Sequence, residues 1–307
     1  MSLGQATKPR WASWLRVSLS VGVSFGLLLL VFGSLDIGRI KALFTGSHPA
    51  WFLGAALLVP LQVYLGASRW RRVSVDLDMN LSMRRAVEEY GLSVLLNQVL
   101  PGGMAGDATR VWRHKQGHGS FAAPLRAAVV DRVIGHWAHL LVTALGLLAW
   151  VPLHGVAAPS GSGTLVAVVV LIFAVLWTRP LPGLRSLVED TRTALASGPQ
   201  LVFHTATSVL LVATFLFSFW LCAQGLGLTL GWAAVTAVPL LMLVMVIPLS
   251  LGGWGLREVS AAVVLSFLGW TTEESIALSA AYGIVNLIGA LPAVAVLLRP
   301  MARKATA

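Results

Sequence analysis

The feature that most constrains this chain is a series of long apolar runs separated by short stretches rich in arginine. Crossing the hydrocarbon core of a bilayer takes about 17–25 apolar residues, and several of the runs reach that length. Charged residues make up only 11% of the chain, whereas a soluble domain carries about 25%. The sequence therefore predicts an integral membrane protein and excludes a soluble domain.

Eight segments are candidates for membrane-crossing helices. They are residues 17–35, 51–67, 127–151, 164–178, 201–224, 232–249, 259–270 and 276–298. The first is longer than the apolar region of about 7–15 residues in a signal peptide, so we expect it to be a retained helix. The predicted fold class is all-α, a polytopic helical bundle of about eight transmembrane helices with additional re-entrant or broken helices. We expect residues 17–298 to form this domain, between cytoplasmic tails at residues 1–16 and 299–307.

The distribution of basic residues orients the predicted bundle. With the N-terminus in the cytoplasm and alternating crossings, 19 of the 22 lysines and arginines fall on the cytoplasmic side. Cytoplasmic loops of membrane proteins carry this excess. The pattern predicts a multi-pass protein of the bacterial cytoplasmic (inner) membrane with both termini inside. Because the charges lie in short loops between apolar runs, the net charge of +10 does not indicate nucleic-acid binding.

One short apolar run ends in a break that carries charge. The stretch NQVLPGGMAGDATR contains Asn97, Pro101, Gly102, Gly103, Gly106, Asp107 and Arg110. Basic residues flank this segment on both sides, so a re-entrant hairpin from the cytoplasmic face keeps both flanks inside. Irregular backbone at membrane depth is tolerated only where it is buried in protein or lines a wet cavity. The break therefore predicts a polar cavity or burial against neighbouring helices.

A second stretch near the other end of the chain has a similar pattern: a proline, then glycines, then two residues of opposite charge. MVIPLSLGGWGLREVS contains Pro248, Gly252, Gly253, Gly255, Arg257 and Glu258. We expect its acid–base couple on the cytoplasmic side as well, so that both hairpins enter from the inner face. Interrupted segments at corresponding positions of two halves point to the central site of a transporter. The alternative is that loops of membrane proteins are often rich in glycine and proline, so an internal repeat is possible rather than required.

Asp131 and Arg132 lie inside the third predicted span, and charged residues there are functional candidates. Neighbouring residues on a helix diverge by about 100°, so each needs a partner elsewhere. We expect Arg132 to pair with Asp107 or Glu258, and Asp131 to pair with Arg110 or Arg257. The network either binds a headgroup phosphate, which the arginine fork suits, or only holds the breaks in place.

His136 and His139 share a helical face with Arg132. They are candidates for proton coupling or, more simply, for helix packing. We find no further ligands that would make a metal site, and no motif that implies a cofactor.

Taken together, the two glycine-rich stretches and the segment around Asp131 and Arg132 resemble the lysylphosphatidylglycerol synthase transmembrane family, also described as flippase-like. The resemblance covers roughly residues 15 to 300. The family's Asn-x-x-x-Pro-Gly…Gly-Asp…Arg block matches residues 97–110, and its Asp-Arg-x-x-Gly block matches Asp131, Arg132 and Gly135. Its Pro…Gly-Gly-x-Gly-x-Arg-Glu block matches residues 248–258. In the full synthases a soluble aminoacyl-transferase domain follows the membrane region, and here the chain stops at Ala307. The resemblance therefore implies the lipid-translocating part without lysyl transfer, so we do not expect an enzyme, and it leaves the lipid open.

We expect a flippase-like lipid transport protein of the inner membrane that binds and translocates an anionic or modified phospholipid. The expected partners are membrane lipids, with a homo-oligomer possible. The alternatives are a small-solute secondary transporter and an accessory subunit of an enzyme that modifies lipids. The predicted substrate site consists of Asn97, Pro101, Gly102, Gly103, Gly106, Asp107, Arg110, Asp131, Arg132, Gly252, Gly253, Gly255, Arg257 and Glu258.

Overall fold

A computed structural model of the protein describes residues 35–100, 104–115, 121–164, 184–245 and 253–298, together with residues 22, 26, 167 and 171. Every regular element within these residues is helical. Four of the described stretches are long and apolar enough to cross a membrane: Pro49–Asp76, Ala122–His154, Gly198–Gly225 and Thr272–Leu297. The protein is therefore a polytopic helical membrane protein, as its sequence predicts.

The helices are α2 (Ile37–Thr45), α3 (Pro49–Asp76), α4 (Met83–Val99), α5 (Ala105–Lys115), α6 (Ala122–His154), α8 (Arg185–Ala194), α9 (Gly198–Gly225), α10 (Ala233–Val244), α11 (Leu256–Ser266), α12 (Thr272–Ala290) and α13 (Val294–Leu297). A short 3₁₀ turn, η2 (Leu291–Ala293), joins α12 to α13. Their starts follow local chemistry. The side chains of Ser82, Ser197 and Thr271 accept backbone N–H groups at the starts of α4, α9 and α12, as N-cap residues do.

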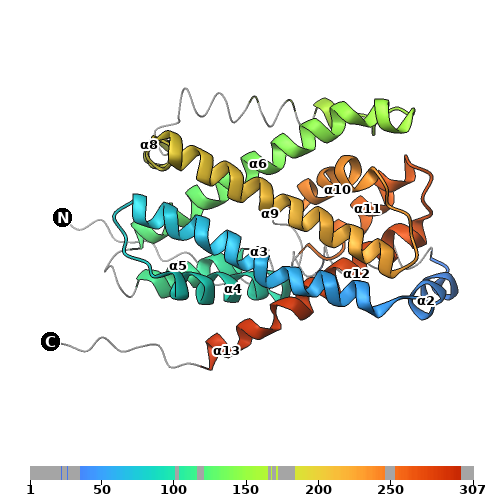
Figure 1. Ribbon diagram of the computed structural model, residues 1–307, viewed down its shortest axis with the longest axis horizontal. Helices are drawn as coiled ribbons and strands as arrows, with labels where there is room; N and C mark the ends of the chain where they lie inside the picture. Colours follow the sequence, from blue (N-terminus) through green and yellow to red (C-terminus); the bar gives the residue numbers. More distant parts are fainter. Residues whose placement is uncertain are drawn as a thin grey trace.

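The described helices form two halves with the same order of elements. In each half a long helix is followed by two short helices and a second long helix: α3, α4, α5 and α6, and then α9, α10, α11 and α12. The directions are opposite, because α3 runs away from α2 whereas α9 runs toward the end that holds α2 (Figure 1). This order is the one expected of an inverted repeat.

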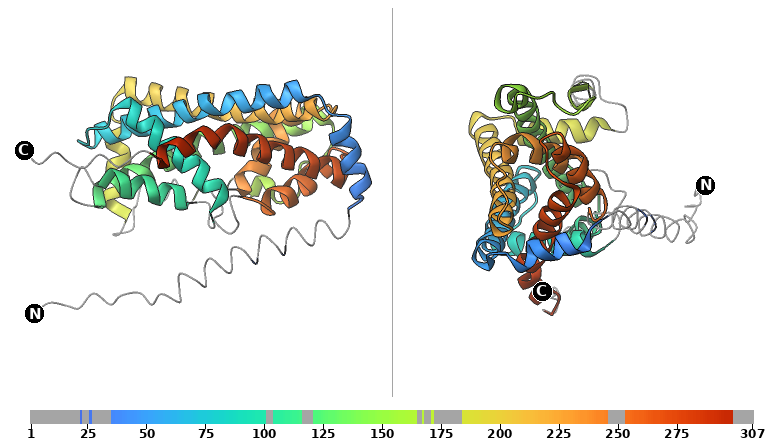
Figure 2. Two further views of the ribbon diagram at one scale, coloured as in Figure 1. Left: turned by 90° about the horizontal axis from the view of Figure 1, so that it is seen from below. Right: turned by 90° about the vertical axis from the view of Figure 1, so that its right-hand side faces the viewer.

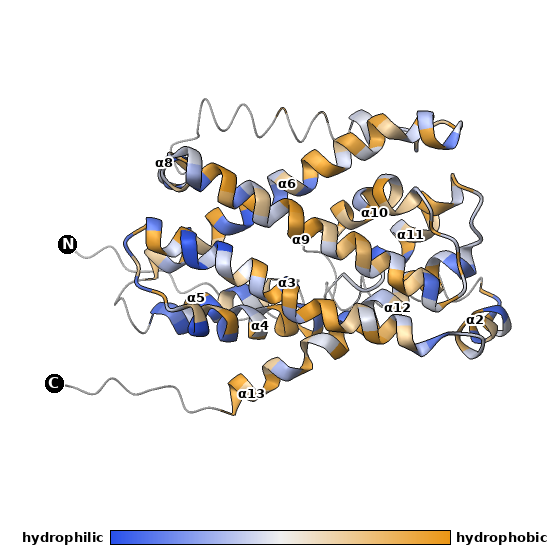
Figure 3. Cartoon of the chain, in the orientation of Figure 1, coloured by the Kyte–Doolittle hydropathy of each residue, from blue (hydrophilic) through white to orange (hydrophobic). Residues whose placement is uncertain are grey.

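The two pairs of short helices enter the bundle from opposite ends. α4 and α5 lie at the end that also holds α8, and α10 and α11 lie at the end that holds α2 (Figure 1). We call the first the basic end, because Arg72, Arg84, Arg85, Arg113 and Lys115 belong to it, and the other the α2 end. Hydrophilic residues gather on α5 at the basic end, whereas α9 is mostly apolar (Figure 3).

Two of the predicted spans are wrong. Residues 232–249 contain α10, which has 12 residues, and residues 259–270 fall largely on α11, which has 11. At 1.5 Å per residue, helices this short reach about 16–18 Å, well below the ~30 Å hydrocarbon core. The expectation that both hairpins enter from the inner face is also wrong. The hairpin of α4 and α5 enters from the basic end, whereas that of α10 and α11 enters from the α2 end (Figure 1).

Close helix contacts hold each hairpin against its neighbours. A Cβ on Gly106 of α5 would lie 2.0 Å from the carbonyl oxygen of Ser93 on α4, so only glycine fits there. Likewise a Cβ on Gly146 of α6 would lie 2.5 Å from the carbonyl oxygen of Val235 on α10. The long helices α3 and α9 pack side by side along the bundle, as the views across and along its axis show (Figure 2). The first hairpin is thus tightly packed between its own two arms, and the second is tightly packed against α6.

Several predicted features lie outside the described residues. They are Pro101, Gly102, Gly103, Pro248 and Gly252, most of the predicted spans at 17–35 and 164–178, and the tails at 1–16 and 299–307.

Candidate functional site

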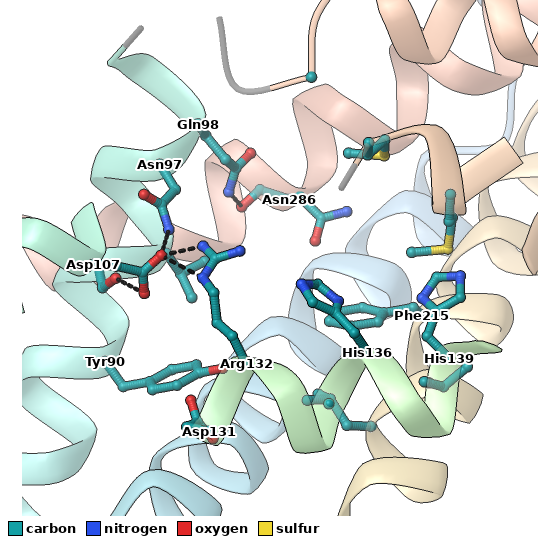
Figure 4. A pocket seen from close by; sticks show the side chains of 18 of the residues that line it. Tyr90, Asn97, Gln98, Asp107, Asp131, Arg132, His136, His139, Phe215 and Asn286 are labelled. Atoms are coloured by element: carbon teal, nitrogen blue, oxygen red, sulfur yellow. Dashed lines mark hydrogen bonds and ion pairs between the residues drawn. The ribbon is translucent and has the colours of Figure 1, made fainter. Parts of the chain in front are cut away.

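A cavity of about 340 Å³ lies where the inner ends of the two hairpins meet. The first hairpin contributes Asn97, Gln98, Met104 and Asp107, and the second contributes Met242, Met245, Gly253 and Arg257. The long helices α3, α6, α9 and α12 supply the remaining wall, including Arg69, Asp131, Arg132, Phe215 and Asn286. The cavity therefore belongs to both halves of the molecule (Figure 4).

Asp107 is held by the hairpin that carries it. It lies in the first turn of α5, and its carboxylate accepts hydrogen bonds from the side chains of Ser93 and Asn97 on α4, each at 3.2 Å. The Asn97 side-chain oxygen in turn accepts the backbone N–H of Gly106 at 2.8 Å. Since these contacts join both arms of the hairpin, the position of Asp107 depends on how α5 packs against α4.

The same carboxylate binds two arginines. Arg110, one turn further along α5, approaches it at 3.0 Å. Arg132 of α6 donates to it from Nε at 2.8 Å and also from a terminal guanidinium nitrogen. Figure 4 shows the Arg132 side chain reaching from α6 toward Asp107 and Asn97. Asp107 therefore ties the hairpin to α6.

Asp131 forms the second centre of the network. Arg69 of α3 donates from Nε to its carboxylate at 2.7 Å, and Arg110 donates from both terminal nitrogens at 3.2–3.3 Å. Arg69 also donates to the hydroxyl of Ser208 on α9 at 3.0 Å. Asp131 and Arg132 thus point to different partners, as their adjacent positions on a helix require.

The guanidinium of Arg110 also lies between two aromatic rings. Its central carbon is 4.8 Å from the ring centre of Trp70 and 5.1 Å from that of Tyr90. Such cation–π contacts offset part of the cost of burying the charge.

Arg69, Asp107, Arg110, Asp131 and Arg132 form what we call the five-residue cluster. In their ordinary charge states three guanidinium groups meet two carboxylates, which leaves one positive charge in excess. Arg69, Arg110 and Asp131 are buried, whereas the Arg132 side chain is 32% exposed. The excess positive charge is therefore accessible from the cavity at Arg132.

The second hairpin carries a different arrangement, the Arg257–Glu258 pair. Arg257 donates to one carboxylate oxygen of Glu258 from Nε at 3.1 Å and from a terminal nitrogen at 2.8 Å. The hydroxyl of Ser279 on α12 accepts from Arg257 and donates to the same oxygen of Glu258, both at 3.0 Å. Both charged side chains are almost fully buried. Charge is thus balanced within the hairpin.

Glycines shape the start of α11. Gly253 and Gly255 have φ angles of 87° and 85°, in the left-handed region that favours glycine. The other carboxylate oxygen of Glu258 accepts the Gly255 N–H at 2.7 Å, which caps the first turn of the helix. Gly253, Gly255, Arg257 and Glu258 therefore form one local unit, of which Gly253 and Arg257 line the cavity.

The two predicted histidines have separate surroundings. His136 lines the cavity beside Arg132 (Figure 4). His139 also lines it, but one ring nitrogen lies 2.9 Å from the carbonyl oxygen of Pro239 on α10, so that nitrogen donates. Among the described residues no three His, Cys, Asp or Glu side chains are grouped closely enough to hold a metal ion.

The predicted pairs Arg132–Asp107 and Asp131–Arg110 are both present, whereas Arg257 and Glu258 pair with each other. Arg69 was not among the predicted site residues, because the predicted span ends at residue 67 and leaves Arg69 in a loop. The helix continues to Asp76, and Arg69 lines the cavity from within it. Tyr90 and Ser208 were also missed, since a single hydroxyl group carries no distinctive signal in the sequence.

A family model described as lysylphosphatidylglycerol synthase TM region matches residues 17–293. No curated protein and no solved structure matches the chain. Because the family match spans most of the sequence and includes the cavity, the chain belongs to this family of membrane proteins.

Proposed function

We propose that this member of the lysylphosphatidylglycerol synthase transmembrane family binds the anionic headgroup of a membrane lipid in its central cavity and moves that lipid between the leaflets of the cytoplasmic membrane. The observation that carries the proposal is the cavity between two opposed hairpins, in which one accessible arginine supplies excess positive charge. The coarser statement, a membrane protein related to lipid modification or transport, follows from the family itself.

The charge of the site favours an anion. Arg132 presents a planar fork that binds phosphate bidentately, and it sits in a cluster with one positive charge in excess. In addition, α5 and α11 both begin beside the cavity and run outward to opposite ends. Their N-terminal dipole ends therefore converge on it, as in transporters whose broken helices bind anionic substrate groups.

The lining of the cavity favours an amphipathic ligand. Charged and amide side chains such as Asn97, Asp107 and Arg132 occupy one part of the wall. Phe215, Met242 and other aliphatic or thioether side chains occupy another. A lipid headgroup with the start of its acyl chains matches both parts, whereas a small polar solute matches only the first. The basic end faces the cytoplasm in this proposal, in accord with the positive-inside rule.

The test is transport of fluorescent phospholipid analogues in vesicles that contain the purified protein. We expect the wild type to accelerate exchange of an anionic analogue between leaflets. Arg132→Gln should slow this exchange by about tenfold or more, because a hydrogen bond to a charged group contributes about 1.5–3 kcal/mol. The matched control is Arg126→Gln on the same helix. Arg126 pairs with Asp190 outside the cavity, so this variant should keep wild-type rates.

The outcomes separate the candidate functions. Equal rates for Arg132→Gln and wild type would show that the cluster is only structural. Inorganic phosphate taken up by the vesicles, with no exchange of any lipid analogue, would favour a small-solute transporter. Absence of both activities in the wild type would favour an accessory subunit.

A further inference from the structure

A buried histidine next to the cavity has no part in the network described so far. His204 of α9 is 0% exposed, and neither ring nitrogen has a hydrogen-bond partner among the described residues. Leaving a buried polar group unsatisfied costs about 1–3 kcal/mol. An apolar side chain would fill the same place without that cost, so the imidazole calls for an explanation.

An acidic group lies beside the ring. The carboxylate of Asp76, at the end of α3, is 3.9 Å from Nε2 of His204. Asp76 also accepts from Arg72, whose side chain is nearly half exposed at the basic end. The positive charge of a protonated His204 would therefore be stabilised by the Asp76 carboxylate. Arg72 connects that carboxylate to the protein surface.

His204 is also connected to the anion site. Ser208 follows it by one turn on α9, on the same face, and its hydroxyl accepts from Arg69 at 3.0 Å. Arg69 is bound to Asp131, and Arg69, Ser208 and Asp131 all line the cavity. One arginine thus separates the imidazole from the place where the anion is proposed to bind.

Two arginines and two carboxylates act on the buried ring. They are Arg69, Arg72 and Asp76 of α3 and Asp131 of α6. None of the described residues of α10 or α12, which also pack on α9, is among them. Asp190 of α8 is paired with Arg126. Protonation adds a positive charge that Arg69 repels, and an anion in the cavity offsets this repulsion.

We infer that His204 and Asp76 form a proton-binding site coupled to the cavity, so that the protein takes up a proton together with its anionic ligand. This inference rests on the proposed binding of an anion, and it adds a second ligand to that function. Because linkage is reciprocal, the anion binds more tightly when His204 is protonated. Transport of the anion is then driven or opposed by a proton gradient.

The test uses the purified full chain and a short-chain phosphatidylglycerol as the probe. Binding is measured in a weakly buffered solution with a pH indicator, at several pH values between about 5.5 and 8. We expect wild-type protein to take up roughly one proton or less per bound probe. We also expect its affinity to be several-fold higher at about pH 5.5 than at about pH 8. His204→Gln should bind the probe with neither proton uptake nor this pH dependence.

Two further variants make the assignment specific. His154→Gln is the control, because His154 is bonded to Thr236 and neither residue lines the cavity, and it should behave as wild type. Asp76→Asn keeps the imidazole but removes its carboxylate, and it should move the rise in affinity to lower pH. If His204→Gln does not fold, Asp76→Asn still tests the site.

The possible outcomes separate the proton-binding inference from the proposed function on which it rests. Probe binding without proton uptake in the wild type overturns the inference and leaves the proposed function standing. Uptake that persists in His204→Gln but is lost in His136→Gln moves the proton to the cavity histidine and overturns the assignment. No binding of the probe at any pH contradicts the proposed function itself.

Discussion

The two hairpins differ in how they pair the acidic residue at the start of their second helix. Each returning helix begins at the cavity with an acidic residue in its first turn, Asp107 in α5 and Glu258 in α11. Asp107 binds an arginine of its own helix and one from α6, which is partly exposed. Glu258 binds its immediate neighbour Arg257 and a serine of α12, with both charges buried. The first network is open and spans three helices, whereas the second is closed.

This difference indicates a division of labour. A closed pair has its charges satisfied and offers a ligand little electrostatic gain. An open cluster with excess positive charge offers an anion a site without leaving a carboxylate unpaired. We therefore propose that the open network at the first hairpin supplies the charged side chains that bind the ligand, whereas the Arg257–Glu258 pair of the second mainly stabilises the fold.

The largest expected effect on stability is at Asp131. Asp131→Asn removes the carboxylate that Arg69 and Arg110 share, and both arginines are buried. We expect the free energy of unfolding to fall by about 3–5 kcal/mol, measured by denaturant unfolding in mixed micelles. Glu258→Gln removes the carboxylate of one arginine, not of two, and keeps an acceptor for the Gly255 N–H, so it should cost less. A larger loss of stability in Glu258→Gln than in Asp131→Asn would contradict the proposed difference between the two hairpins.

A smaller effect is expected from added bulk at the helix contacts. In Gly106→Ala the new methyl group meets a backbone carbonyl, which cannot move alone. In Gly283→Ala it would lie 2.2 Å from a terminal nitrogen of Arg257, a side chain that can shift. We expect overpacking costs of about 1–3 kcal/mol, with Gly106→Ala the larger, in the same unfolding assay. Equal costs would indicate that the second hairpin is as rigid as the first.

The smallest effect is expected at Ser279. Ser279→Ala removes one hydrogen bond to each member of the Arg257–Glu258 pair. We expect a loss of about 1 kcal/mol per bond at most and lipid exchange at the wild-type rate. Slower exchange with unchanged stability would give the second hairpin a direct part in transport.

The sequence predicts the class of protein, the first hairpin and two of its ion pairs, because each of these is encoded locally. Apolar run length and loop charge give the membrane class, and the adjacency of Asp131 and Arg132 forces their partners to lie elsewhere. The second hairpin was misread because hydropathy reports the cost of transferring a segment into lipid. It does not report whether two short apolar helices cross or turn back.

Residues brought in by tertiary packing were less accessible. Arg69 was assigned to a loop because an arginine ends an apolar window, although α3 continues for seven residues beyond it. Likewise nothing in the sequence around His204 indicates that Asp76, on another helix, lies beside it.

The opposed entry of the short helices has a consequence for the energy barrier. A helix of 12 residues, such as α10, reaches about 18 Å, a little more than half of the hydrocarbon thickness. Together, the two hairpins therefore place peptide dipoles and fixed charges across most of the depth of the hydrocarbon core. In the proposed transport, a headgroup at the point where the two hairpins meet would then be surrounded by charged and amide side chains instead of hydrocarbon.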